Sequence, residues 1–357
     1  MTARIRADLD QLPTYVPGRN IPGTVKLASN EVSAGPLPSV VAAIADATAH
    51  INRYPDNGMT TLVDRLADRL AVPPSQLAVG CGSVSLCQQL VQATCRHDDE
   101  VLFAWRSFEE YPRLTQVAGA RPRTVPLRPD HTHDLPAMLN AITPATRLVF
   151  VCSPNNPTGT ASKREELIEF LDAVPDGVLV ALDEAYHEFV TDADVPDGVA
   201  LGRQRDNLAV LRTFSKAYGL AGLRVGYCVA PERITAALCK MFVTFSVNAL
   251  AQVAAVASLE VADELLARCQ GIATERSRVR AELLAMGYLV TESQANFVWL
   301  PLGEQAAAFA EHCLEHKVVI RPFPGDGARV TMSDDAGENE SFLTAAKAWL
   351  DKAQPPM

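Results

Sequence analysis

Short apolar runs alternate with segments of helical spacing from about residue 60 to residue 230. A short run without polar interruption is typical of a strand buried on both faces, as in a parallel sheet. The alternation of such runs with helices therefore predicts a mostly parallel sheet flanked by helices. The predicted strands are 77–79, 100–103, 147–152, 178–182, 208–212 and 223–229, and the predicted helices are 60–70, 84–95, 163–173 and 234–240.

The pattern changes after residue 246. A long helical stretch at 249–286 is followed by short strand candidates at 297–300, 318–321 and 329–332 and by a closing helix at 340–352. We therefore expect an α/β protein with a large domain at 30–245 and a smaller α+β domain at 246–357. Residues 1–29 are punctuated by Pro and Gly, which predicts an irregular segment that packs on the small domain.

Composition and charge narrow the class of protein. The chain has 357 residues, of which 48% are hydrophobic and 21% charged, as in an ordinary soluble globular protein. Its net charge of −10, without any block of Lys and Arg, argues against nucleic acid and anionic membranes as partners. The most apolar stretch, 241–262, is interrupted by polar residues and predicts a buried helix, not a membrane span. The first thirty residues carry charged residues without an apolar core segment, so we expect no signal peptide.

The cysteines and histidines predict no metal site. Eight cysteines lie in apolar stretches without a Cys-x-x-Cys pair, which is typical of core thiols in a reducing compartment. We therefore expect a cytoplasmic protein. His131 and His133 have ligand-like spacing, but they lie between Pro129-Asp130 and Asp134 and predict an exposed turn.

Candidate chemistry centres on Lys216, which ends the run Thr213-Phe214-Ser215-Lys216 and is followed eight residues later by Arg224. An amine, two hydroxyls and a guanidinium at a strand-to-turn junction suit a phosphorylated aldehyde cofactor. The hydroxyls and Arg224 would bind the phosphate, and the amine would form a Schiff base.

Polar residues also follow other predicted strands. Asp183 ends an apolar run, where it could pair with a pyridinium nitrogen or, alternatively, serve as a helix N-cap. Tyr186 follows it and could donate to a ring oxygen. The glycine turn before Ser83 and Val84 could hold phosphate at a helix N-terminus, and the loop containing Asn156 could point an amide at the ring, although either segment could be a plain turn. Pyridoxal phosphate is the common cofactor that needs all of these groups.

The order of these motifs resembles the fold-type I pyridoxal-phosphate aminotransferases, and it is similar to their histidinol-phosphate aminotransferase branch over nearly the whole chain. The resemblance implies an aspartate-aminotransferase-like fold. The motifs that carry it are Asn156-Pro-Thr-Gly, Asp183-Glu-Ala-Tyr186, Ser215-Lys216-Ala, Gly222-Leu-Arg224-Val-Gly226, Arg53-Tyr54-Pro55-Asp56 and Arg329-Val-Thr331.

The resemblance also implies roles for individual residues. Lys216 would carry the cofactor and act as the catalytic base, Asp183 would pair with the ring nitrogen, and Asn156 and Tyr186 would contact the ring oxygen. The phosphate would be held by Ser83, Val84, Thr213, Ser215 and Arg224.

Other implied residues bind the ring or the substrate. Phe108 would stack on the cofactor ring, although it could be a core residue. Arg329 would bind the substrate carboxylate, or it could pair on the surface. Tyr15 is a candidate lining residue. Tyr54 would reach the site of the neighbouring subunit, which implies a homodimer.

One departure from the branch concerns the substrate. The phosphate turn continues Ser83-Val84-Ser85-Leu86, without the usual acidic residue. Together with the segments at 105–109 and 245–249, this resembles actinobacterial aromatic-amino-acid aminotransferases. The resemblance implies ping-pong transfer of an amino group between an aromatic amino acid such as phenylalanine and a 2-oxo acid, with 2-oxoglutarate as the expected acceptor.

Several alternatives stay open from the sequence. A histidinol-phosphate aminotransferase would need further groups for a second phosphate, and Arg321 could be one of them. A decarboxylase or carbon–sulfur lyase would retain Lys216 and Asp183. Two alternatives belong to other functional classes: a ligand-binding regulator and a nicotinamide dehydrogenase.

Overall fold

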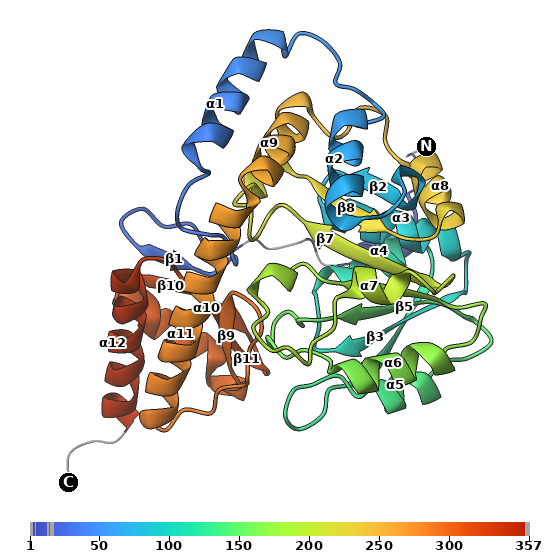
Figure 1. Cartoon of the computed structure of the whole chain (residues 1–357). Coiled ribbons are helices and arrows are strands. Elements are labelled where there is room, and N and C mark those ends of the chain that lie inside the picture. The colour runs from blue at the N-terminus through green and yellow to red at the C-terminus, as the bar shows by residue number, and fades with distance from the viewer. Residues whose placement is uncertain (1–2, 4, 13, 15–17, 354–357) are drawn as a thin grey trace.

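The computed structural model describes residues 3, 5–12, 14 and 18–353 and is built around two sheets (Figure 1). The larger sheet has seven strands in the order β2-β8-β7-β6-β5-β3-β4. Its strands pair in parallel except β8, which is antiparallel to both of its neighbours, so the predicted mostly parallel sheet is confirmed. The strands are β2 (Leu77–Gly80), β3 (Glu100–Trp105), β4 (Arg121–Pro126), β5 (Thr146–Cys152), β6 (Leu179–Asp183), β7 (Leu208–Thr213) and β8 (Gly226–Val229).

Two hydrophobic clusters cover the two faces of this sheet. On β5, Leu148 and Phe150 belong to one cluster, whereas Val149 and Val151 belong to the other, because successive side chains of a strand point to opposite faces. The apolar runs seen in the sequence are therefore strands buried on both sides. The helices of the first two thirds of the chain are α1 (Pro38–Ala47), α2 (Thr60–Leu70), α3 (Ser83–Thr94), α4 (Glu110–Val117), α5 (Leu135–Asn140), α6 (Arg164–Ala173), α7 (Gly198–Gly202) and α8 (Glu232–Met241).

The smaller sheet has the order β1-β10-β11-β9, and α10, α11 and α12 lie beside it (Figure 1). Its first strand comes from near the N-terminus and pairs in parallel with β10, so segments far apart in the chain form one sheet. The expected domain limits at 29/30 and 245/246 stay a prediction. The elements are β1 (Val25–Leu27), α9 (Ala249–Glu260), α10 (Ala262–Ala285), β9 (Phe297–Leu300), α11 (Ala306–Glu315), β10 (Val318–Phe323), β11 (Gly327–Thr331) and α12 (Ala336–Ala353).

Three of the differences from the predicted elements have a clear physical cause. No apolar run predicts the strand β4, because it is an edge strand that contains two arginines, a threonine and two prolines and buries only Val125. The long helix expected at 249–286 is broken at Val261, whose φ of −113° and ψ of 24° lie outside the helical range. The strand expected from residue 223 begins only at Gly226, because Arg224 adopts a left-handed conformation with a φ of 60°.

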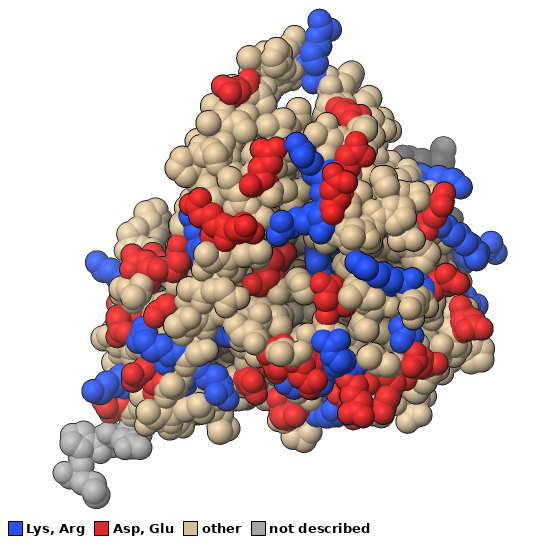
Figure 2. Space-filling view, viewed as in Figure 1, with Lys and Arg blue, Asp and Glu red and all other residues tan. Residues whose placement is uncertain are grey.

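Surface and thiol chemistry agree with the composition. On the face shown in Figure 2, acidic and basic side chains are interspersed among the described residues, without a continuous basic patch. Within the described part of the chain, the helices are all too short or too polar to cross a bilayer. The eight cysteines, all within that part, are free thiols and most are buried.

Candidate active site

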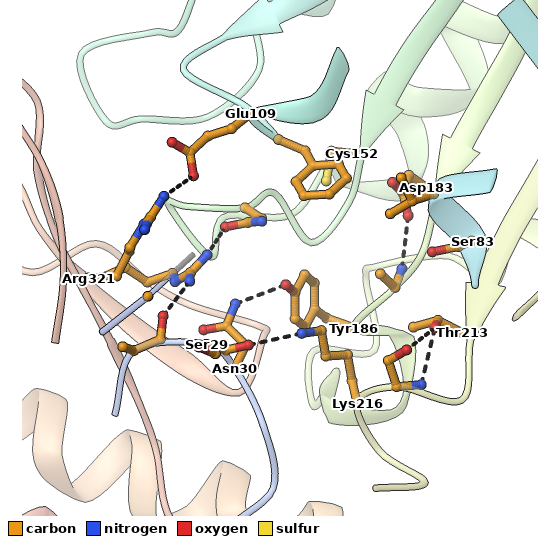
Figure 3. Close-up of a pocket in the computed structure, with 18 of the residues that line it drawn as sticks. Ser29, Asn30, Ser83, Glu109, Cys152, Asp183, Tyr186, Thr213, Lys216 and Arg321 are labelled. Carbon is orange, nitrogen blue, oxygen red and sulfur yellow. Dashed lines mark hydrogen bonds and ion pairs between the residues drawn. The ribbon is translucent and has the colours of Figure 1, made fainter. Parts of the chain in front are cut away.

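One cavity of about 240 Å³ collects residues from both sheets (Figure 3). Eleven residues predicted to bind cofactor or substrate line it: Ser83, Val84, Phe108, Asn156, Asp183, Tyr186, Thr213, Ser215, Lys216, Arg224 and Arg329. They come from segments more than two hundred residues apart, so the tertiary structure brings the motifs together.

The cavity lies at the carboxyl ends of the central parallel strands. Cys152, Asp183 and Thr213 are the last residues of β5, β6 and β7, and all three line the cavity. In an open α/β sheet the loops beyond these ends form the ligand crevice. The order of the strands therefore explains why polar residues that directly follow apolar runs converge here.

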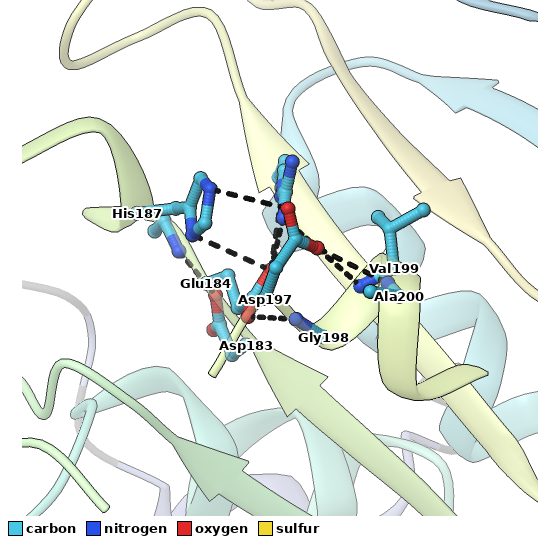
Figure 4. A network of polar contacts seen from close by, with 9 residues as sticks. Asp183, Glu184, His187, Asp197, Gly198, Val199 and Ala200 are labelled. Atoms are coloured by element: carbon cyan, nitrogen blue, oxygen red, sulfur yellow. Dashed lines mark hydrogen bonds and ion pairs between the residues drawn. The ribbon is translucent and has the colours of Figure 1, made fainter. Parts of the chain in front are cut away.

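A buried ion-pair network ties two of these strand ends together (Figure 4). Arg212 precedes Thr213, and Glu184 follows Asp183, so their side chains point away from the cavity side of the strands. The Arg212 guanidinium donates to Glu184 Oε2 at 2.7 Å and 2.9 Å and to Asp197 Oδ1 at 2.9 Å. The Arg212 and Glu184 side chains are buried. This network holds the ends of β6 and β7 at a fixed separation.

Asp183 is buried and has a specific hydrogen-bond partner. Tyr111 Oη donates to Asp183 Oδ2 at 2.7 Å, and the Ala185 amide donates to Asp183 Oδ1 at 3.3 Å. Burial raises the pKa of the Asp183 carboxyl to about 6, and the Tyr111 hydrogen bond opposes that rise. Above pH 6 the site therefore holds a carboxylate that a cationic ring nitrogen would stabilise.

Lys216 places its amine beside a backbone carbonyl. Its Nζ donates to the Ser29 carbonyl at 3.1 Å, and it lies 5.9 Å from the centre of the Tyr186 ring. Burial, followed by the positive charge of Arg329, lowers the pKa of the Lys216 amine to about 7. A large fraction of the amine is therefore neutral near pH 7, as a nucleophile or a base requires.

Hydroxyls and a guanidinium gather beside the N-terminus of α3. Thr213 Oγ1 donates to Ser215 Oγ at 3.0 Å, and Arg224 Nη1 donates to the same oxygen at 3.2 Å. Ser83 and Val84 are the first residues of α3, where backbone amides favour an anion.

Two glycines keep this cluster open. A Cβ at Gly82, which has a φ of 77°, would collide with the Arg224 guanidinium, and a Cβ at Gly226 would lie 2.6 Å from the Ser83 nitrogen. The residues present thus fit a phosphate group, and side chains at either glycine would close the space.

Two asparagines link the cavity to the smaller sheet. Asn30 Nδ2 donates to Tyr186 Oη at 2.9 Å. Arg329 donates to Asn156 Oδ1 and, at 2.8 Å, to the Ala28 carbonyl. Burial raises the pKa of the Tyr186 phenol to about 12, so this hydroxyl stays protonated and can donate.

Phe108 lies on the cavity wall and its ring meets Tyr111 edge-on, with the ring centres 5.5 Å apart. Tyr111 in turn stacks on Phe150 at 4.3 Å. The ring that faces the cavity therefore rests on a packed aromatic group, which restricts its movement.

Two predicted residues stand apart from this cavity. Tyr54 has an exposed side chain that stacks on Phe245, with ring centres 4.5 Å apart, and it does not line the cavity of its own chain. Tyr15 lies outside the described residues.

The structure also adds residues that the sequence patterns did not indicate: Ser29, Asn30, Glu109, Tyr111 and Cys152. Tyr111 lies three residues beyond Phe108, at a helical spacing that could have drawn attention to it. Asn30 reaches Tyr186 across 156 positions of the chain, and no local pattern indicates that pairing.

The prediction that His131 and His133 lie in an exposed turn is wrong for His133. His131 has a φ of 65°, so the chain reverses there and carries the His133 side chain into the interior, where it is only 5% exposed. Burial lowers the pKa of His133 to about 4. At neutral pH this histidine is therefore an uncharged core residue.

Comparisons with known proteins agree with this geometry. The family model described as aminotransferase class I and II matches residues 22–345. An aromatic amino acid aminotransferase of Rhodococcus jostii is 61% identical over 97% of this chain and 96% of its own. One of Mycobacteroides abscessus is 56% identical over 98% of this chain and 100% of its own.

A solved structure has the same fold as this chain. The histidinol-phosphate aminotransferase of Sinorhizobium meliloti, in complex with pyridoxal-5'-phosphate, superimposes with a TM-score of 0.89 at 28% identity, over 99% of each chain.

Proposed function

The chain belongs to the class I and II aminotransferases, and from that premise we propose that it moves an amino group from an aromatic amino acid to a 2-oxo acid. Phenylalanine is the expected donor, 2-oxoglutarate the expected acceptor, and pyridoxal 5'-phosphate the cofactor. The placement of Lys216 and Asp183 in one cavity carries the proposal. The aromatic donor is supported by the relatives from Rhodococcus and Mycobacteroides, which are more than half identical over nearly the whole chain.

The cavity residues divide into a phosphate end and a ring region. When bound, pyridoxal 5'-phosphate supplies a carbonyl carbon that exchanges amino groups and a ring that withdraws electrons. The N-terminus of α3, Thr213, Ser215 and Arg224 would hold its phosphate, because they converge on one space that two glycines keep open. Phe108 would cover one face of the ring.

Asp183 would hold the proton on the ring nitrogen. Its pKa of about 6 means that the carboxyl is mostly ionised at neutral pH, and an ionised carboxylate favours the protonated form of a neighbouring base. Tyr186, whose phenol stays protonated, and Asn156 would donate to the ring oxygen on the other side.

Lys216 would carry the cofactor and then move the proton on the substrate Cα. A base is most effective when its pKa lies near the working pH, and the pKa of Lys216 is lowered to about 7. Proton transfer by a positioned side chain contributes about 10²–10⁴-fold to rate.

Arg329 would bind the substrate carboxylate. Its guanidinium is held by the Ala28 carbonyl and by Asn156, so it is already oriented toward the cavity. A planar guanidinium can form two parallel hydrogen bonds to a carboxylate, which a lysine ammonium cannot.

We also propose a homodimer in which Tyr54 reaches the phosphate end of the partner's site. Tyr54 is 81% exposed and stacks on Phe245, and the two segments that meet at this contact also expose the apolar side chains of Ile51, Val243 and Phe245. An exposed apolar patch of this kind is typical of an interaction surface.

The eight free thiols support a cytoplasmic location, where thiols stay reduced.

A donor panel tests the proposal directly. Phenylalanine, tyrosine, tryptophan and histidinol phosphate would be compared at one concentration of 2-oxoglutarate, with glutamate formation as the readout. We expect kcat/KM for the best aromatic donor to exceed that for histidinol phosphate by roughly tenfold or more, a difference of about 1.4 kcal/mol. Lys216→Ala is the negative control. A preference for histidinol phosphate would support the alternative donor, and absence of glutamate with every donor would refute transamination.

A further inference from the structure

Two arginines lie opposite each other at one end of the cavity. The antiparallel register of β10 and β11 pairs Arg321 with Arg329, and both side chains line the cavity. Their guanidinium carbons lie 5.7 Å and 5.6 Å from the centre of the Phe323 ring. Like charges directly opposite one another on paired strands are unfavourable without a counter-charge.

Glu109 supplies that counter-charge from the other sheet. It directly follows Phe108 and precedes α4, and its Oε2 accepts a hydrogen bond from Arg321 Nη2 at 3.0 Å (Figure 3). Arg329, in contrast, donates to the amide oxygen of Asn156 and to the carbonyl of Ala28, both neutral groups. Glu109 therefore places a negative charge beside the two arginines at this end of the cavity and offsets part of their positive charge.

We infer that Glu109 is a specificity-determining residue that selects carboxylate substrates against phosphate-bearing ones. The inference rests on the proposed function and names the group behind its donor preference. The Glu109 carboxylate repels an anionic ligand and engages Arg321. A phosphate ester carries about −1.5 to −2 at pH 7, so this repulsion costs it more than it costs a singly charged carboxylate.

Removal of the Glu109 charge should change the ratio of the rate constants for the two donors, not only the affinity for each of them. Removing the negative charge of Glu109 raises the local potential by the same amount for every ligand. A ligand with twice the charge gains about twice the interaction energy, so the phosphate-bearing donor gains more than the carboxylate-bearing one. The Arg321 charge, at present paired, becomes available to the phosphate.

Glu109→Gln tests this in the cofactor-loaded enzyme. The rate of the first half-reaction would be followed by cofactor absorbance with L-phenylalanine or L-histidinol phosphate alone, so that the charge of the acceptor plays no part. We expect the ratio of the two rate constants per donor concentration to move toward histidinol phosphate by roughly tenfold or more. The dissociation constant of inorganic phosphate, measured by calorimetry, should fall by a similar factor without any turnover.

Asp326→Asn is the matched control. Asp326 pairs with Arg106 at 2.6 Å and is similarly exposed, but it does not line the cavity. This variant removes the same charge from the same neighbourhood, and we expect the donor ratio to stay within about twofold of the unmodified enzyme, because the charge lies outside the site.

Two further variants complete the charge cycle. Arg321→Gln lowers the local charge by one unit and should move the ratio away from the phosphate-bearing donor. Glu109→Gln combined with Arg321→Gln restores the original net charge and should return the ratio toward its original value. Comparison of Arg321→Gln with the double variant tests the inference even if the single Glu109 variant does not fold.

An unchanged ratio in Glu109→Gln and in Arg321→Gln, with phenylalanine still converted, would overturn the inference and leave the proposed function intact. Failure of the unmodified enzyme to convert phenylalanine would instead overturn the proposed function.

Discussion

Tyr111, whose ring meets that of Phe108 edge-on, donates a 2.7 Å hydrogen bond to Asp183. Tyr111 is buried and lies 72 residues before Asp183 in the sequence. The bond favours the ionised form of the carboxyl, which burial opposes. One side chain therefore both supports the cavity wall and tunes the group proposed to hold the ring proton.

Tyr111→Phe should remove this tuning with little change in shape. Without the hydrogen bond the pKa of Asp183 rises further, so the acidic limb of the kcat/KM profile should move to higher pH. A hydrogen bond to a charged group contributes about 1.5–3 kcal/mol, so kcat/KM at pH 7 should fall by roughly tenfold to a hundredfold. A uniform loss of rate with an unshifted pH profile would contradict the tuning role.

The amine of Lys216 should react with the cofactor in a pH-dependent way. Because its pKa is lowered to about 7, the reactive neutral form increases as pH rises through 7 and is nearly complete at pH 8.5. The rate of covalent attachment, followed by absorbance after pyridoxal 5'-phosphate is added to cofactor-free protein, should rise and level off over this range. A rate that continued to rise up to pH 10 would indicate an ordinary lysine. Lys216→Ala should show no covalent attachment and no turnover.

Arg212→Met should destabilise the protein strongly, because it leaves the Glu184 carboxylate buried without its charged partner. Breaking a buried ion pair from one side costs about 3–5 kcal/mol. The free energy of unfolding in urea measures the loss. Arg65→Met is the control, since Arg65 forms an exposed pair with Glu260, and such pairs contribute about 0–1 kcal/mol. Equal losses of unfolding free energy in the two variants would show that the buried network contributes no more to stability than an exposed ion pair.

Subunit mixing tests the position of Tyr54. Tyr54→Ala and Lys216→Ala homodimers should each have little activity. A hybrid of the two contains one site with an intact Lys216 and an intact Tyr54 from the other subunit. We therefore expect activity to reappear on mixing, up to about a quarter of the unmodified level if subunits exchange randomly, since half of the dimers are hybrids with one intact site. Without recovery in a sample shown to contain hybrids, Tyr54 would have to act within its own subunit.

Local patterns were sufficient to predict the central strands, the cofactor motifs and the placement of polar residues at strand ends. This follows from physical rules that act over a few residues: a strand buried on both faces must be apolar, and a polar residue at its end must have a partner. The prediction that Lys216 and Asp183 share one site could therefore be made before any coordinates, and both residues line the cavity.

Only the tertiary structure decided which distant side chains meet. The Tyr111–Asp183 hydrogen bond depends on how α4 packs on the sheet, and the Glu109–Arg321 pair depends on how the two sheets face each other. The break at Val261 and the burial of His133 arise in the same way, from contacts that no short window of sequence contains. Hydrophobic periodicity determines which face of an element is buried, whereas the partner across the core is selected by strand order and register.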